Sequence, residues 1–306
     1  NFEGHCSTEI FPIKPSPQLS RDYLLYWFLA DSTMERINAT CTGARMPRAD
    51  MNEVLAFDFP FPPLPEQRRI VGILDEAFAA IAAAKASAEL NLQNARALFE
   101  SHLNTVFSQK GDGWVEKRLG DIGRTCTGST PKTAEKDNYG DFIPFIKPAD
   151  FNSDGSLDYK NDGLSRKGAN EARIIPAGSV LMVCIGTIGK CGYCEKDVAT
   201  NQQINALIPH SGVDYRFVYY QMRANDLQCR ARSSSAQTTI PIINKSKWSA
   251  LTVAVPQTIQ EQRDIAGFLD ALSAETRRLE GLYTRKLEGL TALKQSLLHA
   301  AFSGEL

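Results

Sequence analysis

Two stretches of this chain begin in the same way, "PLPEQRRIVGILDEAF" at residues 63–78 and "TIQEQRDIAGFLDALS" at residues 258–273. They share identical residues at an offset of 195, namely Glu66, Gln67, Arg68, Ile70, Gly72, Leu74 and Asp75 with Glu261, Gln262, Arg263, Ile265, Gly267, Leu269 and Asp270. The segments before them also repeat, at an offset of 194, so that Tyr26 matches Tyr220 and Pro47 matches Pro241. This internal repeat predicts a unit made of a globular module followed by one long segment.

Each long segment has the pattern of a helix that is packed along its whole length. Prolines precede Glu66, and prolines before a helix and an acidic residue in its first turn are start signals. The apolar positions alternate between spacings of four and three, at 70, 74, 77, 81, 84, 88, 92, 95, 98, 102 and 106, with His102 as the polar exception. Adding 195 gives a second stripe whose polar exception is Thr276.

The two predicted helices complement each other in side-chain size. Each would hold about forty residues and extend about 60 Å. The first is rich in alanine and the second in leucine, which favours close packing of one on the other. A whole module separates them in the chain, which permits an antiparallel pair. We therefore predict an intramolecular antiparallel coiled coil, with an ordinary buried helix pair as the simpler alternative.

The composition excludes several classes of protein. The chain has 306 residues, 43% of them hydrophobic, with 34 basic and 35 acidic side chains. These values are ordinary for a globular protein and exclude a disordered or collagen-like chain. No apolar run is long enough for a membrane span, and the N-terminus has no signal-peptide pattern. The 7 cysteines are odd in number and scattered. We therefore expect reduced thiols and a cytoplasmic location.

Positive charge is concentrated in one block of the sequence. Residues 114–257 carry 18 basic and 14 acidic side chains, whereas the blocks on either side are acidic or near neutral. The pattern in this block is mixed α/β: "SVLMVCIGTIG" (179–189) predicts a buried strand that runs into a glycine turn, and "DFIPFIKPADF" (141–151) predicts an edge strand. "DYRFVYYQMRAND" (214–226) predicts an amphipathic helix. A modest excess of positive charge is compatible with phosphate contact.

Several predicted loops of this block combine small residues with basic or amide side chains. They are "TGSTPK" (127–132), "GLSRKG" (163–168), "GTIGK" (186–190), "ATNQQ" (199–203) and "CRARSSSAQTT" (229–239). Arg and Lys suit guanine, Asn and Gln suit adenine, and all suit phosphate. Any one of these residues is more simply a solvated loop residue, but the set favours DNA. The candidate DNA-binding residues are Thr130, Lys132, Lys147, Arg166, Lys167, Lys190, Asn201, Gln202, Gln203, Arg230, Arg232, Ser234, Gln237 and Thr238.

Catalytic, cofactor and metal sites are not predicted. "GTIGK" is not a phosphate loop, because Cys184 stands where the motif needs glycine and Cys191 where it needs Ser or Thr. Cys191 and Cys194 have the spacing of zinc ligands, but no second pair accompanies them, so structural thiols are the simpler interpretation. The histidines have no nucleophile pattern around them. We therefore expect no catalytic residues, no metal and no cofactor.

Taken together, these motifs resemble the specificity subunit of type I restriction–modification systems. The resemblance rests on the duplicated helix starts, on "WVEKRLGDIGRTCTGSTPKTAEKDNYGDFIPFIKPADF", on "IPAGSVLMVCIGTIGK" and on "SSAQTTIPIINKSKW", in this order. It implies that residues 1–58 are the C-terminal part of a first target-recognition domain and that 59–113 are the central spacer helix. Residues 114–257 would be the second target-recognition domain, and 258–306 the distal spacer helix.

The resemblance also implies a function and its partners. The chain would be a non-catalytic subunit that reads a bipartite site on double-stranded DNA and docks modification (methyltransferase) subunits, to which restriction subunits add. The first recognition domain lacks its N-terminal part, so either the chain is a fragment or two copies pair as a homodimer on a palindromic site. The alternative function is a coiled-coil protein–protein scaffold with a peptide-reading module; an enzyme ranks third, for want of catalytic residues.

Overall fold

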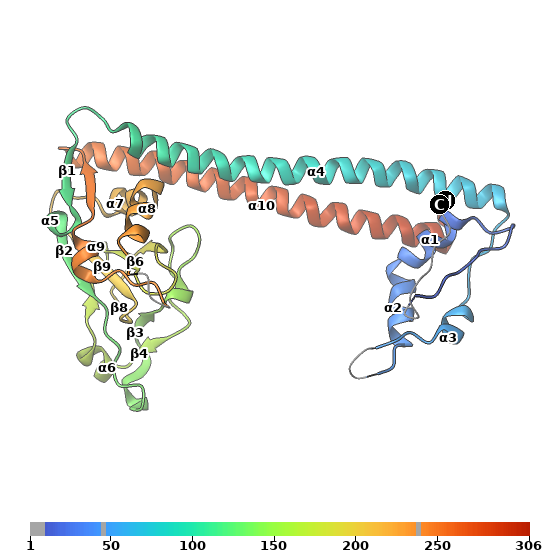
Figure 1. Ribbon diagram of the computed structural model, residues 1–306, viewed down its shortest axis with the longest axis horizontal. Coiled ribbons are helices and arrows are strands. Elements are labelled where there is room, and N and C mark those ends of the chain that lie inside the picture. Colours follow the sequence, from blue (N-terminus) through green and yellow to red (C-terminus); the bar gives the residue numbers. More distant parts are fainter. Residues whose placement is uncertain (1–9, 44–46, 237–239) are drawn as a thin grey trace. The chain divides into compact units, whose positions relative to one another are not determined.

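The computed structural model describes residues 10–43, 47–236 and 240–306. The chain divides into two units: unit 1 comprises Asn1–Asn94 and Leu279–Leu306, and unit 2 comprises Ala95–Arg278. Two long helices, α4 (Leu64–Gln109) and α10 (Ile259–Ser303), contribute residues to both units (Figure 1). The predicted fold class, mixed helix and strand with two long helices, is confirmed.

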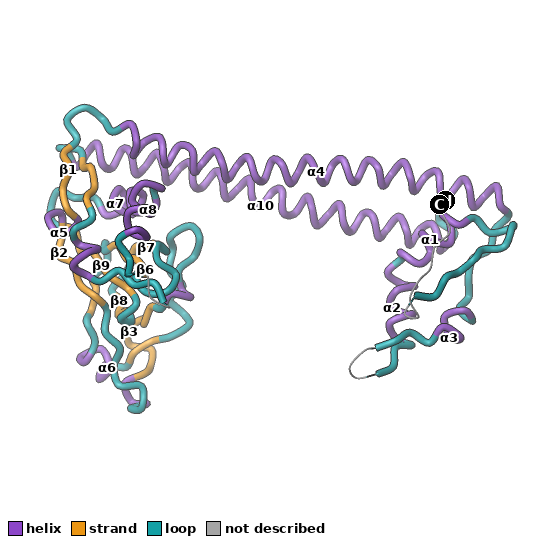
Figure 2. Tube along the Cα trace, in the orientation of Figure 1, coloured by secondary structure: helices purple, strands orange, loops and turns teal. Residues whose placement is uncertain are grey.

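Unit 2 contains the sheets (Figure 2). One has two strands in the order β1-β10, and the others have four each, in the orders β2-β9-β6-β7 and β4-β3-β8-β5. The strands are β1 (Val115–Arg118), β2 (Gly123–Thr127), β3 (Tyr139–Ile146), β4 (Gly163–Leu164), β5 (Ile174–Ile175), β6 (Val180–Val183), β7 (Cys191–Tyr193), β8 (Val198–Thr200), β9 (Ile204–Pro209) and β10 (Thr252–Val255).

Strand β6 shows why the sequence at 179–189 reads as a continuous apolar run. Successive side chains of a strand point to opposite faces. Val180 and Met182 belong to the core cluster that includes helices α4, α7 (Tyr215–Arg223) and α10, whereas Leu181 and Val183 belong to a second cluster shared with the neighbouring sheet. All these side chains are fully buried. Because both faces of β6 are covered, the strand has no polar alternation, as predicted.

The prediction of an edge strand at residues 141–151 is wrong. Strand β3 lies inside its sheet, between β4 and β8. Its pairing changes sides along its length: Pro144 is opposite Gly163 of β4, and only Phe145 and Ile146 pair with β8. Proline has no N–H to donate to a ladder. Pro144 is tolerated in this interior strand because the pairing with β8 begins after it.

The shorter helices of unit 2 are α5 (Leu119–Ile122), α6 (Arg166–Glu171), α7 (Tyr215–Arg223), α8 (Asn225–Ser233) and α9 (Lys245–Ser249). Helix α7 confirms the predicted amphipathic helix but ends at Arg223, and α8 begins after Ala224. Two predicted loops are therefore partly helical. Arg230 and Arg232 lie in α8, and Arg166 and Lys167 open α6, because the Ser165 side chain caps its N-terminus.

Unit 1 contains three helices that repeat α7, α8 and α9 of unit 2 at the sequence offset of 194. Helices α1 (Arg21–Leu29), α2 (Asp31–Ala39) and α3 (Met51–Leu55) are each 194 residues before α7, α8 and α9. The caps repeat too: Ser20 and Asp214 cap α1 and α7 with their side chains, as Asp50 and Asn244 do for α3 and α9. The repeat is therefore one of three-dimensional structure as well as of sequence.

The strands of unit 2 have no described counterpart in unit 1. Residues 10–15 correspond to β9 by the same offset, yet they form no strand, and Ile10, Phe11 and Ile13 are exposed. Strand β9 is held between β2 and β6 in unit 2. Without such neighbours among the described residues of unit 1, the equivalent segment has no ladder to join.

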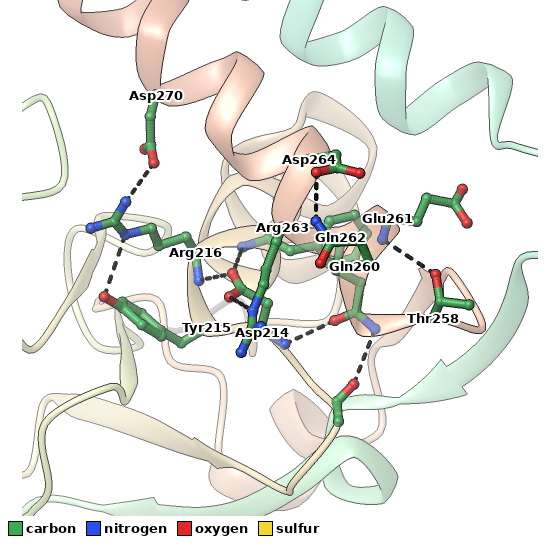
Figure 3. Close-up of polar contacts among 12 residues, drawn as sticks. Asp214, Tyr215, Arg216, Thr258, Gln260, Glu261, Gln262, Arg263, Asp264 and Asp270 are labelled. Carbon is green, nitrogen blue, oxygen red and sulfur yellow. Dashed lines mark hydrogen bonds and ion pairs between the residues drawn. The ribbon is translucent and has the colours of Figure 1, made fainter.

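A buried glutamine amide joins each three-helix set to the long helix that follows it. In unit 2, Gln262 accepts a hydrogen bond from the Asp214 backbone N–H (2.8 Å) and donates to the carbonyl oxygens of Gly212 (3.2 Å) and Pro256 (3.3 Å), as Figure 3 shows in part. In unit 1, Gln67 accepts from the Ser20 N–H (2.8 Å) and donates to the carbonyls of Gln18 (3.1 Å) and Pro62 (2.8 Å). We call this arrangement the glutamine clip.

A tyrosine and an aspartate complete each junction about two turns further along the long helix. Tyr220 of α7 donates to Asp270 of α10 (2.7 Å), and Arg216 also binds this carboxylate (2.8 Å; Figure 3). In unit 1, Tyr26 of α1 donates to Asp75 of α4. Burial and the Asp270 hydrogen bond both raise the pKa of Tyr220, so its hydroxyl stays protonated and remains a donor. The glutamine, aspartate and tyrosine of these junctions are thus among the residues that the repeat keeps identical.

The long helices run antiparallel within each unit. In unit 1, Ile70 and Leu74 pack with Leu298 and Ala301, while Lys85 donates to Thr291 (2.7 Å). In unit 2, the ring of His102 lies against that of Phe268, with centroids 6.1 Å apart. Both observations confirm the predicted antiparallel pairing.

The predicted stripe on α4 holds as far as Ala95 and then fails. Leu98 is 53% exposed and His102 is also exposed, whereas the buried residues are Phe99, Leu103 and Phe107. An α-helix has 3.6 residues per turn, so a face spaced by four and three drifts around it. In unit 2 the helix also packs on α7, since Phe107 contacts Phe217 with ring centroids 5.4 Å apart. The buried face therefore moves by one residue toward that module.

None of the helices in the described residues is both long enough and apolar enough to span a membrane.

Replacing Gln262 with alanine is expected to destabilise unit 2. It leaves the Asp214 N–H and the carbonyls of Gly212 and Pro256 without their partner at a position that is 1% exposed. Each buried polar group left unpaired costs about 1–3 kcal/mol. Chemical denaturation should show this loss for Gln262→Ala and almost none for the control Gln260→Ala, an exposed side chain bonded only to Asp264. Equal stabilities of the two variants would disprove a structural role for the clip.

Candidate nucleic-acid interface

The polar loops of unit 2 are joined to one another by hydrogen bonds. Thr130 donates its hydroxyl hydrogen to the Gln202 side chain (2.5 Å), which connects the loop after β2 to the turn between β8 and β9. In that turn, Asn201 donates to the Gln203 side chain (2.9 Å) and accepts from the Gln203 N–H (3.1 Å). Four predicted site residues, Thr130 and the three amides, therefore lie together.

The glycine turn after β6 lies next to this group. The Cys184 N–H donates to the Gln203 carbonyl (2.8 Å), and the Gly186 N–H donates to the Pro241 carbonyl (3.0 Å). Gly186 and Gly189 have φ of 79° and 105°, a region that favours glycine. We call the turn that carries Asn201, Gln202 and Gln203 the amide turn. The glycine turn at 184–190 thus bridges the amide turn and the segment that follows α8. Gln237 and Thr238, two candidates of that segment, lie outside the described residues.

Helix α8 brings a further candidate to the glycine turn. The Gln228 amide donates to the Gly189 carbonyl (2.9 Å), and its oxygen accepts from Arg232 (3.3 Å). Lys190 follows at the end of the turn, and its ammonium donates to the Pro148 carbonyl (3.3 Å). Lys190 and Arg232 line the same cleft, which has a volume of about 460 Å³.

Other candidate cations are held in intramolecular ion pairs elsewhere on unit 2. Lys132 and Lys167 share the Glu135 carboxylate, at 3.4 and 2.9 Å, and these contacts lower the pKa of Glu135. Lys147 pairs with Asp162 (2.8 Å). These side chains are exposed, so the pairs add little stability, but each charge already has a partner.

Arg230 and Arg166, which the sequence analysis groups with Arg232 as candidates, lie in different surroundings from it. Arg230 pairs with Asp226 (2.7 Å) and donates to the Thr252 carbonyl (2.9 Å), which directs it toward β10. Arg166 lies over the Phe142 ring, 4.7 Å from its centroid. Ser234 uses its carbonyl to accept from Lys247 (3.2 Å). The structure thus brings Thr130, Asn201, Gln202, Gln203, Lys190 and Arg232 toward connected loops. Lys132, Lys147, Lys167 and Arg230 differ from Lys190 and Arg232 in that each binds a carboxylate.

The sequence analysis did not identify Arg223 and Gln228, which line the cleft with Lys190 and Arg232. Arg223 closes the amphipathic helix α7, where the apolar pattern drew attention to the buried face only. Gln228 lies one helical turn before Arg232 on α8, and it stands just outside the loop predicted at 229–239. The signal that identifies Gln228 is its i, i+4 spacing from Arg232 on a polar helix face, which requires knowing that residues 225–233 are helical.

The buried cysteines are protonated thiols in the core. Burial raises the pKa of Cys184, Cys191 and Cys194 to about 12. Free thiols with such a pKa stay protonated at neutral pH and are weak nucleophiles. No group of three or more metal-ligating residues is found within residues 10–43, 47–236 and 240–306.

Comparison with known proteins identifies the family. The model of the type I restriction modification DNA specificity domain matches residues 1–92 and 111–288, which is most of the chain. The chain belongs to this family of type I specificity domains. The repeat, the paired long helices and the loop-bearing unit 2 are thus features of a family member.

This specificity-domain chain matches only part of the length of its curated relatives. The specificity subunit of the type I restriction enzyme HindI from Haemophilus influenzae is 30% identical over 203 residues, which are 63% of this chain and 42% of the relative. The MjaIX specificity subunit from Methanocaldococcus jannaschii is 29% identical over 161 residues, 51% of this chain and 37% of the relative. The chain therefore matches about two fifths of each relative.

Solved structures support the fold of this specificity-domain chain. One belongs to work on complex assembly and conformational transition of the type I R-M system. Its superposition on this chain has a TM-score of 0.79 at 21% sequence identity and covers 94% of this chain and 72% of the solved one. The HsdS subunit from Thermoanaerobacter tengcongensis has a TM-score of 0.63, also at 21% identity, covering 94% of this chain and 71% of that one. At this identity the likeness concerns the fold alone.

Thiol labelling of the specificity-domain chain should distinguish Cys229 from the buried cysteines. A raised pKa means a smaller thiolate fraction at any given pH, and Cys184, Cys191 and Cys194 are also shielded from reagents. Iodoacetamide at pH 8 is expected to alkylate the exposed Cys229 in the native protein and the three buried thiols only in denaturant. Peptide mass spectrometry measures both. Fast native labelling of Cys191 would contradict the described core.

Proposed function

We propose that this chain is a non-catalytic DNA-reading subunit of a type I restriction–modification complex. Unit 2 reads one half of a bipartite site on double-stranded DNA, and the chain brings modification subunits to that site. Family membership supports this assignment, and the relatives are themselves specificity subunits. We keep the predicted division, in which residues 114–257 form the recognition domain and 59–113 and 258–306 form the spacer helices, as part of the proposal.

The observation that carries the proposal is the joining of the amide turn to the neighbouring loops. Asn201, Gln202 and Gln203 follow one another on the turn between β8 and β9, and Thr130 contacts them from the next loop. An Asn or Gln side chain offers one donor and one acceptor, the pattern that matches adenine N7 and N6 in the major groove. Gln202 is exposed, so its amide is accessible to a base edge.

Apolar side chains on the outside of the long helices support docking of partner proteins. In unit 2, Leu98 of α4 is 53% exposed and Phe268 of α10 is 51% exposed. In unit 1, Leu90 is 57% exposed. Apolar residues at such positions suit an interface with another protein better than contact with water. We assign these surfaces to the modification subunits, with restriction subunits joining the assembled complex.

Replacing Gln202 with alanine is expected to change base preference without unfolding the protein. Loss of one bidentate amide–base contact costs about 1–3 kcal/mol of discrimination, which is roughly a five- to hundredfold change at one base position. The measurement is competitive binding of the complex reconstituted with modification subunits to a library of duplexes. Gln257→Ala, an exposed glutamine beside Gly113, is the control and should leave the preference unchanged.

The same experiment tests the function itself. Equal binding of the wild-type complex to all duplex sequences would overturn the proposal. Binding that is indifferent to salt would instead favour the protein–protein scaffold, since contact with phosphates weakens as salt rises. A specific wild-type complex whose preference is untouched by Gln202→Ala would retain the function and remove Gln202 from the reading surface.

A further inference from the structure

A cleft in unit 2 combines positive charge with hydrogen-bond donors. Its volume is about 460 Å³, and it lies between the loop after β3, the glycine turn and helix α8. Three of its lining residues are cations and none is acidic. The lining consists of Phe151, Asn152, Ser153, Gly189, Lys190, Cys191, Arg223, Asn225, Gln228 and Arg232. We call it the basic cleft.

The cations of the basic cleft differ from the other candidate cations of unit 2. In the described part of the chain, Lys190 and Arg232 form no ion pair; Lys190 donates to a neutral carbonyl and Arg232 to a neutral amide. By contrast, Lys147 and Arg230 each have a carboxylate within 2.8 Å. Arg223, the third cation, pairs with Glu100 (3.2 Å), so Lys190 and Arg232 carry the positive charge that is available to attract an anion.

Arg223 is held in one orientation at the back of the cleft. Its guanidinium lies 5.0 Å from the Phe99 ring centroid and 5.7 Å from that of Tyr219. It donates to the Tyr219 hydroxyl oxygen (3.0 Å) and to Glu100 (3.2 Å), and its side chain is 20% exposed. A guanidinium has five N–H groups in a rigid plane, so these two bonds fix it and leave donors for a ligand.

Gln228 holds the two sides of the cleft together. Its amide nitrogen donates to the carbonyls of Gly189 (2.9 Å) and Met222 (2.6 Å), while its oxygen accepts from Arg232 (3.3 Å). It is 8% exposed. Gly189 has φ 105°, and a Cβ atom there would lie 2.1 Å from the Gln228 oxygen. The turn that presents Lys190 and the helix that presents Arg232 are therefore fixed relative to each other before any ligand arrives.

We propose that the basic cleft seats a phosphate of the DNA backbone, an inference that rests on the proposed function. Three converging cations with amide and hydroxyl donors match phosphate oxygens, which accept and do not donate. An unstacked base would need an aromatic surface, and the one aromatic lining residue, Phe151, is 6% exposed. Lys190 also belongs to the glycine turn that contacts the amide turn, so the seat fixes the strand next to the residues proposed to read bases.

The first test is the salt dependence of DNA binding by the complex reconstituted with modification subunits. Each phosphate contact contributes about 0.9 to the slope of log K against log salt, so removing one makes the loss of affinity between 50 and 200 mM salt about three- to fourfold smaller. Arg232→Gln and Lys190→Gln are expected to show this change with base preference unaltered. Both side chains are exposed, so neither replacement should affect folding. The control Lys117→Gln removes an equal charge from the exposed strand β1 and should leave the slope unchanged.

The second test distinguishes DNA backbone from a small anion. Duplexes carrying one neutral methylphosphonate linkage are scanned along the site. At one linkage the wild-type complex should lose affinity. The Lys190→Gln, Arg232→Gln double variant should bind the duplex with that linkage as well as it binds the unmodified duplex. If no linkage behaves in this way, or if the variants keep the wild-type slope, the phosphate seat is wrong. Binding of inorganic phosphate that these variants abolish, without any change in DNA slope, would show a small-anion site and overturn the inference.

Failure of the proposed function remains distinguishable from failure of the phosphate seat. If the complex binds all duplexes alike, base reading is wrong, but the salt slopes of that non-specific binding still decide whether the cleft contacts backbone. If the complex binds no DNA under any salt condition, both proposals are overturned.

Discussion

The structure depends on a buried glutamine amide at the start of each long helix. Apolar packing is non-directional, so the apolar stripe of a long helix does not by itself fix how a neighbouring module is oriented on it. Gln262 supplies this information, because one amide binds an N–H and two carbonyls from three separate positions of the chain. Gln67 forms the same set of bonds with different residues around it. An amide with both donor and acceptor atoms in use has one acceptable orientation, and so the junction has one geometry.

The repeat explains which parts of the fold could be predicted. Gln67, Asp75 and their counterparts, which join helix to helix, are identical in the two copies, and a tyrosine from the preceding helix is kept as the partner of each aspartate. The repeat, the start signals around Glu66 and the apolar spacing predicted the two helices, and the module between them in the chain permitted their antiparallel pairing. The stripe was predicted correctly up to Ala95 but not beyond it, because the pattern assumed one packing partner. In unit 2, Phe99 and Phe107 turn instead toward α7, a module that the periodicity does not reveal.

The candidate site was predictable by composition but not by geometry. The amide turn and the glycine turn were recognised from small and polar residues, and the structure joins them. Arg230 and Arg232 were treated alike because they were assigned to a loop. On a helix, residues two apart point about 200° around the axis from each other. Arg230 therefore meets Asp226 and Thr252, while Arg232 meets Gln228 at the basic cleft. Arg223 could not be found from the apolar pattern of α7, because that pattern marks the buried face and not the polar residue at the helix end.

Internal ion pairs decide which part of the positive charge is available to a ligand. Residues 114–257 have 18 basic and 14 acidic side chains, an excess that is too small to define a binding face. The structure divides it unevenly: Lys132, Lys147 and Lys167 have carboxylate partners on unit 2. Lys190 and Arg232 face a cleft without acidic residues. Because long-range potential is the sum over all charges, cations already paired contribute little of it. Lys190 and Arg232 are thus cations of this block that remain available to a ligand, and Lys190 belongs to the glycine turn that contacts Gln203.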